Sequence, residues 1–201
     1  MKENEIKLLF QEKGALLEGH FELTSGRHSE SYLQCALILQ YPEIAENLSN
    51  ELVTKLREEN AGVPIKVNVV CAPALGGIIL GHVVARALNA RAVFAERDSA
   101  SGQLKLRRGF SIQPKESVMA VEDVITTGGS LKEIVQLVHN SGGKLVGVAA
   151  VAERSAPPVD FGVAKTILLK IPLSLYLPAD CPQCKQGIPL IKPGSRPFMQ
   201  G

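Results

Sequence analysis

Apolar residues along the central part of the chain follow patterns typical of alternating strands and helices. Residues 42–60 carry an apolar side chain at every fourth position, which predicts an amphipathic helix with Pro42 near its start. Helices are also expected at residues 78–88 and from residue 130 onward. Short apolar runs predict buried strands at residues 67–71, 92–95, 118–121, 144–152 and 166–169. We therefore predict an α/β fold with a central, mostly parallel sheet flanked by helices.

Composition narrows the function classes. The 201-residue chain has a formal net charge of +2, no tryptophan and 4% aromatic residues. So few aromatic side chains offer little surface on which nucleic-acid bases could stack, and the small charge attracts long polyanions weakly. We expect no nucleic-acid partner, whereas a small anionic substrate in one local pocket is compatible with this composition.

Two apolar stretches could be mistaken for export or membrane signals. Residues 1–11 mix charged and apolar side chains, which is typical of an amphipathic helix start and not of a signal peptide. Residues 67–85 carry no charge, but they contain one proline and three glycines, which argues against a membrane helix. We expect no membrane partner and a cytoplasmic location.

The most informative segment is VMAVEDVITTGGS at residues 118–130. An apolar strand leads into the adjacent carboxylates Glu122 and Asp123, and a loop rich in hydroxyl groups and glycine opens the next helix. In open α/β sheets ligands bind at the carboxyl ends of strands, and a helix N-terminus offers unpaired N–H groups to a phosphate. Carboxylates beside a phosphate cradle suit a phosphorylated sugar, because they accept hydrogen bonds from its hydroxyl groups and favour Mg²⁺. A strand end followed by a simple helix cap is the structural alternative.

This whole segment resembles the motif with which type I phosphoribosyltransferases bind phosphoribosyl pyrophosphate (PRPP). Other segments are similar to the orotate phosphoribosyltransferases of that family: FELTSGRHSESY at 21–32, CAPALGG at 71–77, FAER at 94–97 and ERS at 153–155. The resemblance implies a glycosyltransferase that joins orotate to the ribose 5-phosphate unit of PRPP, with Mg²⁺ as cofactor. It also implies one domain over residues 1–201, with a small N-terminal hood at about 1–40, an α/β core at about 61–175 and a tail at about 178–201.

Roles for individual residues follow from the resemblance. Glu122 and Asp123 would hold the ribose hydroxyls, directly or through Mg²⁺, and Arg97 would contact the pyrophosphate. The resemblance implies catalytic roles for Arg97, Lys105 and Asp123. Thr126 and Arg154 would bind orotate, because a planar guanidinium suits a carboxylate. The cradle for the 5-phosphate would comprise Val124, Ile125, Thr126, Thr127, Gly128, Gly129 and Ser130. The pyrophosphate loop would comprise Ala74, Leu75 and Gly76.

The chain departs from the family pattern at two of these segments. Thr24 stands where many relatives carry a lysine that reaches a substrate phosphate, and it cannot supply that charge. Leu75 and Gly76 stand where many relatives carry tyrosine and lysine in the pyrophosphate loop. The contacts with substrate at these positions are therefore expected to differ from those of such relatives.

A third departure lies in residues 98–109, the expected mobile loop. This stretch contains no histidine, and its cations are Lys105, Arg107 and Arg108. Lys105 is either a catalytic cation or part of an exposed β-hairpin, because Lys105 and Arg107 alternate with leucines. In relatives the loop reaches the neighbouring subunit's site, which implies a homodimer.

Other functions are compatible with a PRPP-binding loop. A phosphoribosyltransferase for purine or other bases would share the loop but lack the resemblance over residues 21–32. A PRPP-sensing transcriptional regulator would need a DNA-binding appendage or a strongly basic face, and neither is evident in the sequence. A nucleotide-sugar binding domain without activity is the third alternative.

Cys181 and Cys184 are compatible with half a zinc site, a redox pair or a packed turn. Zinc usually takes four ligands, and the sequence contains no second C-x-x-C pattern. The histidines lie far from the pair along the chain, at His20, His28, His82 and His139. We predict a structural turn, with a metal bridging two copies of the chain as the alternative.

Overall fold

The computed structural model describes residues 1–23, 26–62, 65–171 and 174–193, so Thr24 lies outside the described residues. The helices are α1 Glu3–Glu12, α2 Ala36–Leu39, α3 Pro42–Glu59, α4 Gly77–Leu88, α5 Gly129–Asn140 and α6 Pro182–Lys185. The strands are β1 Leu16–Glu22, β2 His28–Leu33, β3 Val69–Pro73, β4 Arg91–Arg97, β5 Leu104–Leu106, β6 Ser117–Ile125, β7 Lys144–Glu153, β8 Lys165–Lys170 and β9 Leu175–Tyr176.

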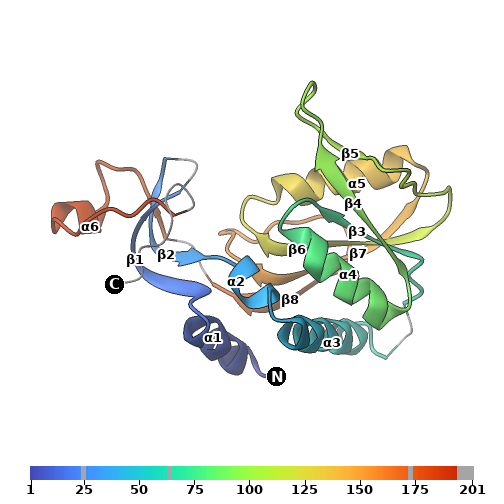
Figure 1. The fold of residues 1–201 in the computed structure, drawn as a ribbon, viewed down its shortest axis with the longest axis horizontal. Helices are drawn as coiled ribbons and strands as arrows, with labels where there is room; N and C mark the ends of the chain where they lie inside the picture. Colours follow the sequence, from blue (N-terminus) through green and yellow to red (C-terminus); the bar gives the residue numbers. More distant parts are fainter. Residues whose placement is uncertain (24–25, 63–64, 172–173, 194–201) are drawn as a thin grey trace.

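A six-stranded sheet forms the centre of the molecule, with the strand order β5-β4-β3-β6-β7-β8 (Figure 1). Strands β4, β3, β6, β7 and β8 are parallel, and β5 alone among these six runs antiparallel to its neighbour. The prediction of an α/β fold with a central, mostly parallel sheet is confirmed. Because these five strands are parallel, their carboxyl ends all open onto the same edge of the sheet.

Helices cover both faces of this sheet, and β6 shows why. Successive side chains of a strand point to opposite faces. Met119 and Val121 belong to a buried cluster that includes the apolar faces of α3 and α4. Val118 and Ala120 belong to a second buried cluster, which includes the apolar face of α5. The uninterrupted apolar run of β6 therefore reflects burial on both faces, as expected for a parallel sheet.

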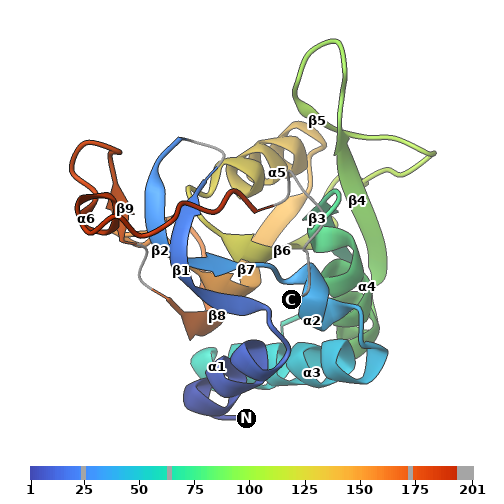
Figure 2. The same cartoon turned by 60° about the vertical axis from the view of Figure 1, so that its left-hand side comes forward.

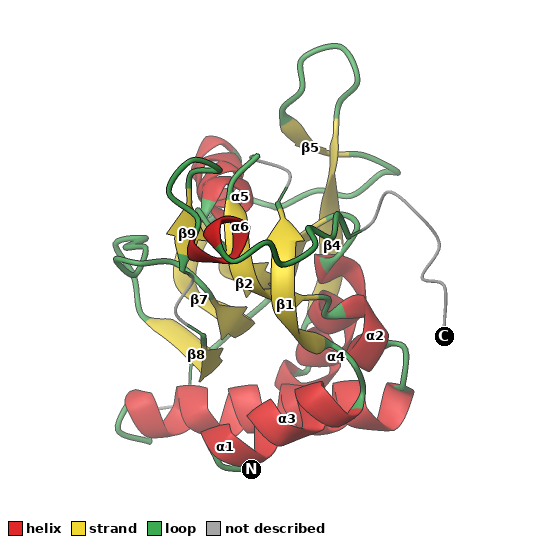
Figure 3. Ribbon diagram, turned by 90° about the vertical axis from the view of Figure 1, so that its left-hand side faces the viewer, coloured by secondary structure: helices red, strands yellow, loops and turns green. Residues whose placement is uncertain are grey.

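A second, smaller sheet lies to one side of the large one (Figure 1, Figure 2). It has the order β1-β2-β9 and is antiparallel. Segments from both ends of the chain meet here, since the backbone of Ile191 exchanges hydrogen bonds with His20 and Glu22 of β1. Helices α1 and α3 lie at the same end of the molecule in a view from the side of the small sheet (Figure 3). Across the described residues, no helix combines the length and apolarity needed to cross a membrane.

The acid pair lies inside strand β6, whereas the sequence pattern places it after the strand. Strand β3 pairs with β6 only as far as Cys71, opposite Ala120, although its pairing with β4 continues to Pro73. Strand β6 continues, because its other neighbour β7 pairs with it as far as Ile125. Glu122 and Asp123 therefore lie at the carboxyl edge of the sheet, beyond the last residue of β6 that pairs with β3.

Candidate active site

The carboxyl edge of the large sheet brings together four of the predicted site segments. Residues 74–76 follow β3, Arg97 ends β4, Glu122 and Asp123 lie near the end of β6, and Arg154 follows β7. These strands are neighbours in the order β4-β3-β6-β7 and run parallel. The loop at residues 74–76 and Arg154, which are more than 50 residues apart in the sequence, therefore lie at the same edge. This edge is where ligands bind in open α/β sheets.

The two acidic side chains are partly buried and mutually repulsive. Burial and the charge of Asp123 raise the pKa of Glu122 to about 7, against a partial opposing effect of a hydrogen bond from Ser130. Burial also raises the pKa of Asp123. In the described part of the chain, neither carboxylate has an ion-pair partner. The pair offers hard oxygen ligands that lack a neutralising cation, and these fit Mg²⁺ or the hydroxyl groups of a sugar.

The loop after β3 packs directly against this acid pair. A Cβ atom at Gly76 would lie 2.9 Å from Oδ1 of Asp123, so any side chain here would displace the carboxylate. Helix α4 starts at Gly77 without a side-chain cap at this edge, and the Ile78 N–H donates to the backbone O of Leu75 at 3.2 Å. Leu75 is 83% exposed beside it. The predicted pyrophosphate loop thus presents backbone, and not the lysine of many relatives, next to Asp123.

Helix α5 starts at the same edge and presents a second N-terminus. Gly128 occupies the position before the helix with a φ of 73° and has no side chain to cap it, while the Gly129 N–H donates to Oγ1 of Thr127 at 3.4 Å. Thr126 and Thr127 are exposed, whereas Ile125 is fully buried in the core. Of the predicted phosphate cradle, Ile125 can therefore contribute only its backbone, while the threonines and the N-terminus of α5 can bind a phosphate.

Gly128 should tolerate no side chain. A Cβ atom would lie 2.8 Å from Cγ1 of Val159, in a backbone conformation that is already unfavourable for other residues. We expect Gly128→Ala to lower the free energy of unfolding by about 2–5 kcal/mol, from left-handed strain plus overpacking. Gly14→Ala is the matched control, because Gly14 has a φ of 65° with no atom within 4 Å of the added Cβ. Urea unfolding of both variants measures the difference, and equal losses would contradict the clash.

Arg154 is a buried cation that has no carboxylate partner among the described residues. It is 4% exposed, and its Nη2 donates hydrogen bonds to the backbone O of Ser31 at 2.8 Å and to Oγ at 2.9 Å. Its Nε is buried and has no hydrogen-bond partner among the described residues. Burial lowers the pKa of the guanidinium. An unbalanced, desolvated guanidinium is a binding position for a small anion such as a carboxylate.

Comparisons with known proteins decide the family. The phosphoribosyl transferase domain model matches residues 38–166. An orotate phosphoribosyltransferase of Carboxydothermus hydrogenoformans is 53% identical over 94% of this chain and 95% of its own. The orotate phosphoribosyltransferase of Pelotomaculum thermopropionicum is 50% identical over 98% of this chain and 99% of its own. The chain belongs to the orotate phosphoribosyltransferase family. It is therefore an enzyme of the glycosyltransferase class, and the resemblance found in the sequence is confirmed.

A solved structure supports the same fold. The orotate phosphoribosyltransferase from Aeropyrum pernix superimposes with a TM-score of 0.66, covering 83% of this chain and 93% of its own. Its identity to this chain is 21%, so this similarity bears on the fold alone. The type I phosphoribosyltransferase fold expected from the sequence is confirmed.

The two loop cations of the orotate phosphoribosyltransferase pattern do not face the acid pair. Arg97 pairs with Glu133 of α5, with 3.1 Å between Nη2 and Oε1, and also donates to the backbone O of Gly102. Lys105 lies 3.4 Å from Oδ1 of Asp98 within the same hairpin. Residues of this hairpin and of α5 line a cavity of about 750 Å³. The β-hairpin expected as one alternative for Lys105 is confirmed, because β5 pairs antiparallel with β4. Arg97 and Lys105 would each have to leave the present ion-pair partner in order to reach a substrate.

The structure adds contacts that the sequence did not reveal. Cys35 donates from Sγ to the backbone O of Asp123 at 3.8 Å, which connects the N-terminal part to the acid pair. Ser31 of β2 holds Arg154 from 123 residues away. The only signal for Ser31 was its place at the end of the segment that resembles the family, and Cys35 lay outside every motif.

Proposed function

We propose that the protein transfers the ribose 5-phosphate unit of PRPP to N1 of orotate, forming orotidine 5′-phosphate and pyrophosphate in UMP biosynthesis. The observation that carries the proposal is Arg154, whose buried guanidinium has no carboxylate partner, and whose Nε has no hydrogen-bond partner, among the described residues. Orotate is a planar base that carries a carboxylate, and a guanidinium fork binds carboxylates with two parallel hydrogen bonds. Adenine and hypoxanthine carry no such group.

We propose that each part of the site acts on a different part of the substrates. The first turn of α5, with Thr126, Thr127 and Ser130, holds the 5-phosphate. Glu122 and Asp123 accept hydrogen bonds from the ribose hydroxyls, and residues 74–76 face the pyrophosphate. Arg154 and Thr126 orient orotate so that N1 faces ribose C1.

The C1–O bond to pyrophosphate would break as the bond to N1 forms, through a ring that gains positive charge as in other glycosyl transfers. In this proposal the carboxylate of Asp123 stabilises that charge. Glu122 and Asp123 would hold Mg²⁺ together with PRPP. The ion would neutralise negative charge on the leaving pyrophosphate. The uncapped N-terminus of α4 would add backbone donors at the same oxygens.

We further propose that the protein works as a homodimer in the cytoplasm. The tip of the β4–β5 hairpin projects away from the body of the chain (Figure 1), which suits a loop that covers a neighbouring subunit's site. Arg97 and Lys105 would then exchange Glu133 and Asp98 for the pyrophosphate of the partner's site. All four cysteines are free thiols, as is usual in a reducing compartment.

Lys105→Ala should lower kcat at least about tenfold without changing the melting temperature, because the exposed side chain would act only on developing charge. Lys144→Ala is the control, since Lys144 is exposed at the opposite edge of the sheet. Mixing Lys105→Ala subunits with Asp123→Asn subunits should restore up to about a quarter of the wild-type rate, since each mixed dimer has one intact loop over one intact site. No recovery, in a mixture shown to exchange subunits, would contradict a loop that acts across the dimer.

The proposed reaction is tested with purified protein, PRPP, Mg²⁺ and orotate. We expect orotidine 5′-phosphate and pyrophosphate to appear in equal amounts, and neither to form when orotate is omitted. PRPP binding without release of pyrophosphate would reject the enzymatic reaction and favour a PRPP-sensing role.

A further inference from the structure

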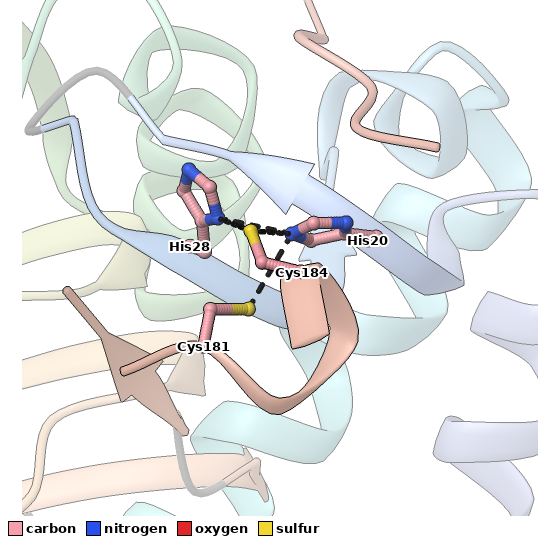
Figure 4. Close-up of side chains that lie close together, drawn as sticks. All are labelled: His20, His28, Cys181 and Cys184. Carbon is pink, nitrogen blue, oxygen red and sulfur yellow. Dashed lines mark hydrogen bonds between the residues drawn. The ribbon is translucent and has the colours of Figure 1, made fainter. Parts of the chain in front are cut away.

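Four side chains with metal-binding atoms meet where the C-terminal segment crosses the small sheet. They come from three elements: His20 from β1, His28 from β2, and Cys181 and Cys184 at the start of α6 (Figure 4). One ligand atom from each residue lies within 4.8 Å of all the others. His20 and His28, which are more than 150 residues from the cysteine pair along the chain, therefore lie beside it in the fold.

Strand pairing explains how distant residues reach this point. The antiparallel pairing of β1 with β2 places His28 opposite Glu22, two residues from His20. The C-terminal segment runs beside β1, because the backbone N–H of Ile191 donates to the backbone O of His20 at 2.8 Å. The turn that carries both cysteines is thereby brought over the histidines.

The distances between ligand atoms suit a tetrahedral ion. His20 Nε2 lies 2.9 Å from His28 Nδ1 and 3.4 Å from Cys181 Sγ, and Cys184 Sγ lies 3.2 Å from His28 Nδ1. Tetrahedral zinc with bonds of about 2.0–2.1 Å to nitrogen and about 2.3 Å to sulfur places its ligand atoms about 3.3–3.8 Å apart. With all four ligand atoms within 4.8 Å of one another, the side chains therefore need only small shifts to surround such an ion.

The orientation of His20 is also that of a metal ligand. Its Nδ1 lies 2.8 Å from the backbone O of Ile188, and a carbonyl oxygen can only accept, so Nδ1 carries the hydrogen. The lone pair of Nε2 then points at His28 and the two sulfur atoms. A hydrogen bond from the second ring nitrogen to a carbonyl is the usual way in which proteins orient metal-binding histidines.

Burial supports a site that is closed. His20 is 2% exposed, His28 4% and Cys181 fully buried, while Cys184 lies at the surface. Four protein ligands leave no open position for a substrate, which distinguishes structural from catalytic zinc sites. Two thiolates and two imidazoles in a tetrahedral arrangement select zinc over Mg²⁺.

We propose that His20, His28, Cys181 and Cys184 of one chain bind a structural Zn²⁺ ion, separate from the phosphoribosyl transfer site. Binding displaces the two thiol protons to solvent and leaves both imidazoles neutral. The ion would fasten the C-terminal segment to β1 and β2. Since β2 also carries Ser31, which holds Arg154, the ion would help to position the orotate-binding guanidinium as well.

The metal content of the full-length protein tests this proposal independently of turnover. We expect about one Zn²⁺ per chain after purification under reducing conditions and dialysis, and loss of the ion in Cys184→Ser. Cys71→Ala and His82→Ala are matched controls, because they remove one thiol and one imidazole elsewhere, and both should retain zinc. Zinc retained at the wild-type level in Cys184→Ser would overturn the assignment.

Cobalt substitution of the wild-type protein gives a readout that does not depend on the folding of any variant. Reduced protein freed of metal should bind Co²⁺ with the intense charge-transfer absorption of thiolate ligands and the visible bands of tetrahedral cobalt. Zn²⁺ should displace it and raise the melting temperature, whereas Mg²⁺ should do neither. Reduced protein that shows no thiolate–cobalt absorption, or purified protein that carries a Cys181–Cys184 disulfide and no zinc, would overturn the proposal.

Discussion

Asp123→Asn should lower kcat/KM for PRPP at least about a hundredfold while leaving the fold as stable as before, or more stable. The amide replaces a carboxylate oxygen by a donor, which cannot accept a hydrogen bond from a ribose hydroxyl or stabilise positive charge on the ring. Burial raises the pKa of Asp123, so the ionised group is held in the free protein at a cost in folding free energy. A neutral amide of the same shape removes that cost.

Activity and unfolding measured on the same preparation test this prediction. Gly76 packs against Asp123, so the substitution must keep the side-chain volume, which asparagine does. Loss of activity with equal or greater stability is the signature of a functional carboxylate. Loss of both would indicate that Asp123 is structural, and full activity would exclude it from the reaction.

The neighbouring acid makes the stability depend on pH. The pKa of Glu122 is about 7 in the folded protein, against 4.5 for the unperturbed group. The folded state therefore holds this proton more tightly, so the stabilisation is complete below the unfolded pKa and is lost as pH rises through the folded pKa. Glu122→Gln should flatten the fall in stability over this window, and an unchanged slope in urea unfolding would contradict the raised pKa.

Arg154→Met should raise the KM for orotate by about a hundredfold or more and leave the KM for PRPP within about threefold. Removing one member of a buried, hydrogen-bonded charge pair costs about 2–5 kcal/mol, and each 1.4 kcal/mol corresponds to about tenfold in affinity. Methionine fills much of the same volume, and it removes a cation whose Nε lacks a partner. The change in folding stability should therefore be small beside the change in orotate binding.

Two further variants separate charge from geometry. Arg154→Lys keeps the charge but loses the planar fork, so we expect most of the orotate defect to persist. Arg91→Met is the control. Arg91 lies at the amino end of β4, away from the carboxyl edge that carries the site, and forms an exposed ion pair with Glu116. Equal losses for orotate and PRPP in Arg154→Met would contradict a role confined to the base.

The central sheet could be predicted from the sequence because its signals are local. The four-residue spacing in 42–60 corresponds to helix α3 Pro42–Glu59, and the apolar run at 118–121 lies inside β6. The end of β6 could not be predicted, since its last residues are strand only because β7 continues beside them. Pairing between strands is not visible in the pattern of one strand.

The parts of the candidate site with local sequence signals could also be predicted, whereas those that depend on long-range contacts could not. The loop at 126–130 was recognisable because glycines and hydroxyl residues at a helix start have a local cause. Ser31, which holds Arg154, and the histidines beside Cys181 lie more than 100 residues away along the chain, and only the folded small sheet brings them close. The ion pairs of Arg97 and Lys105 likewise depend on how the β4–β5 hairpin packs beside α5.

A comparison of four bases under identical conditions tests the central claim most directly. Purified protein with PRPP and Mg²⁺ is given orotate, adenine, hypoxanthine or uracil, and the release of pyrophosphate is followed for each. Because Arg154 offers its guanidinium to a carboxylate that only orotate carries, we expect turnover with orotate and none above background with the other three. Turnover of adenine or hypoxanthine in preference to orotate would contradict the assignment of the base site to Arg154.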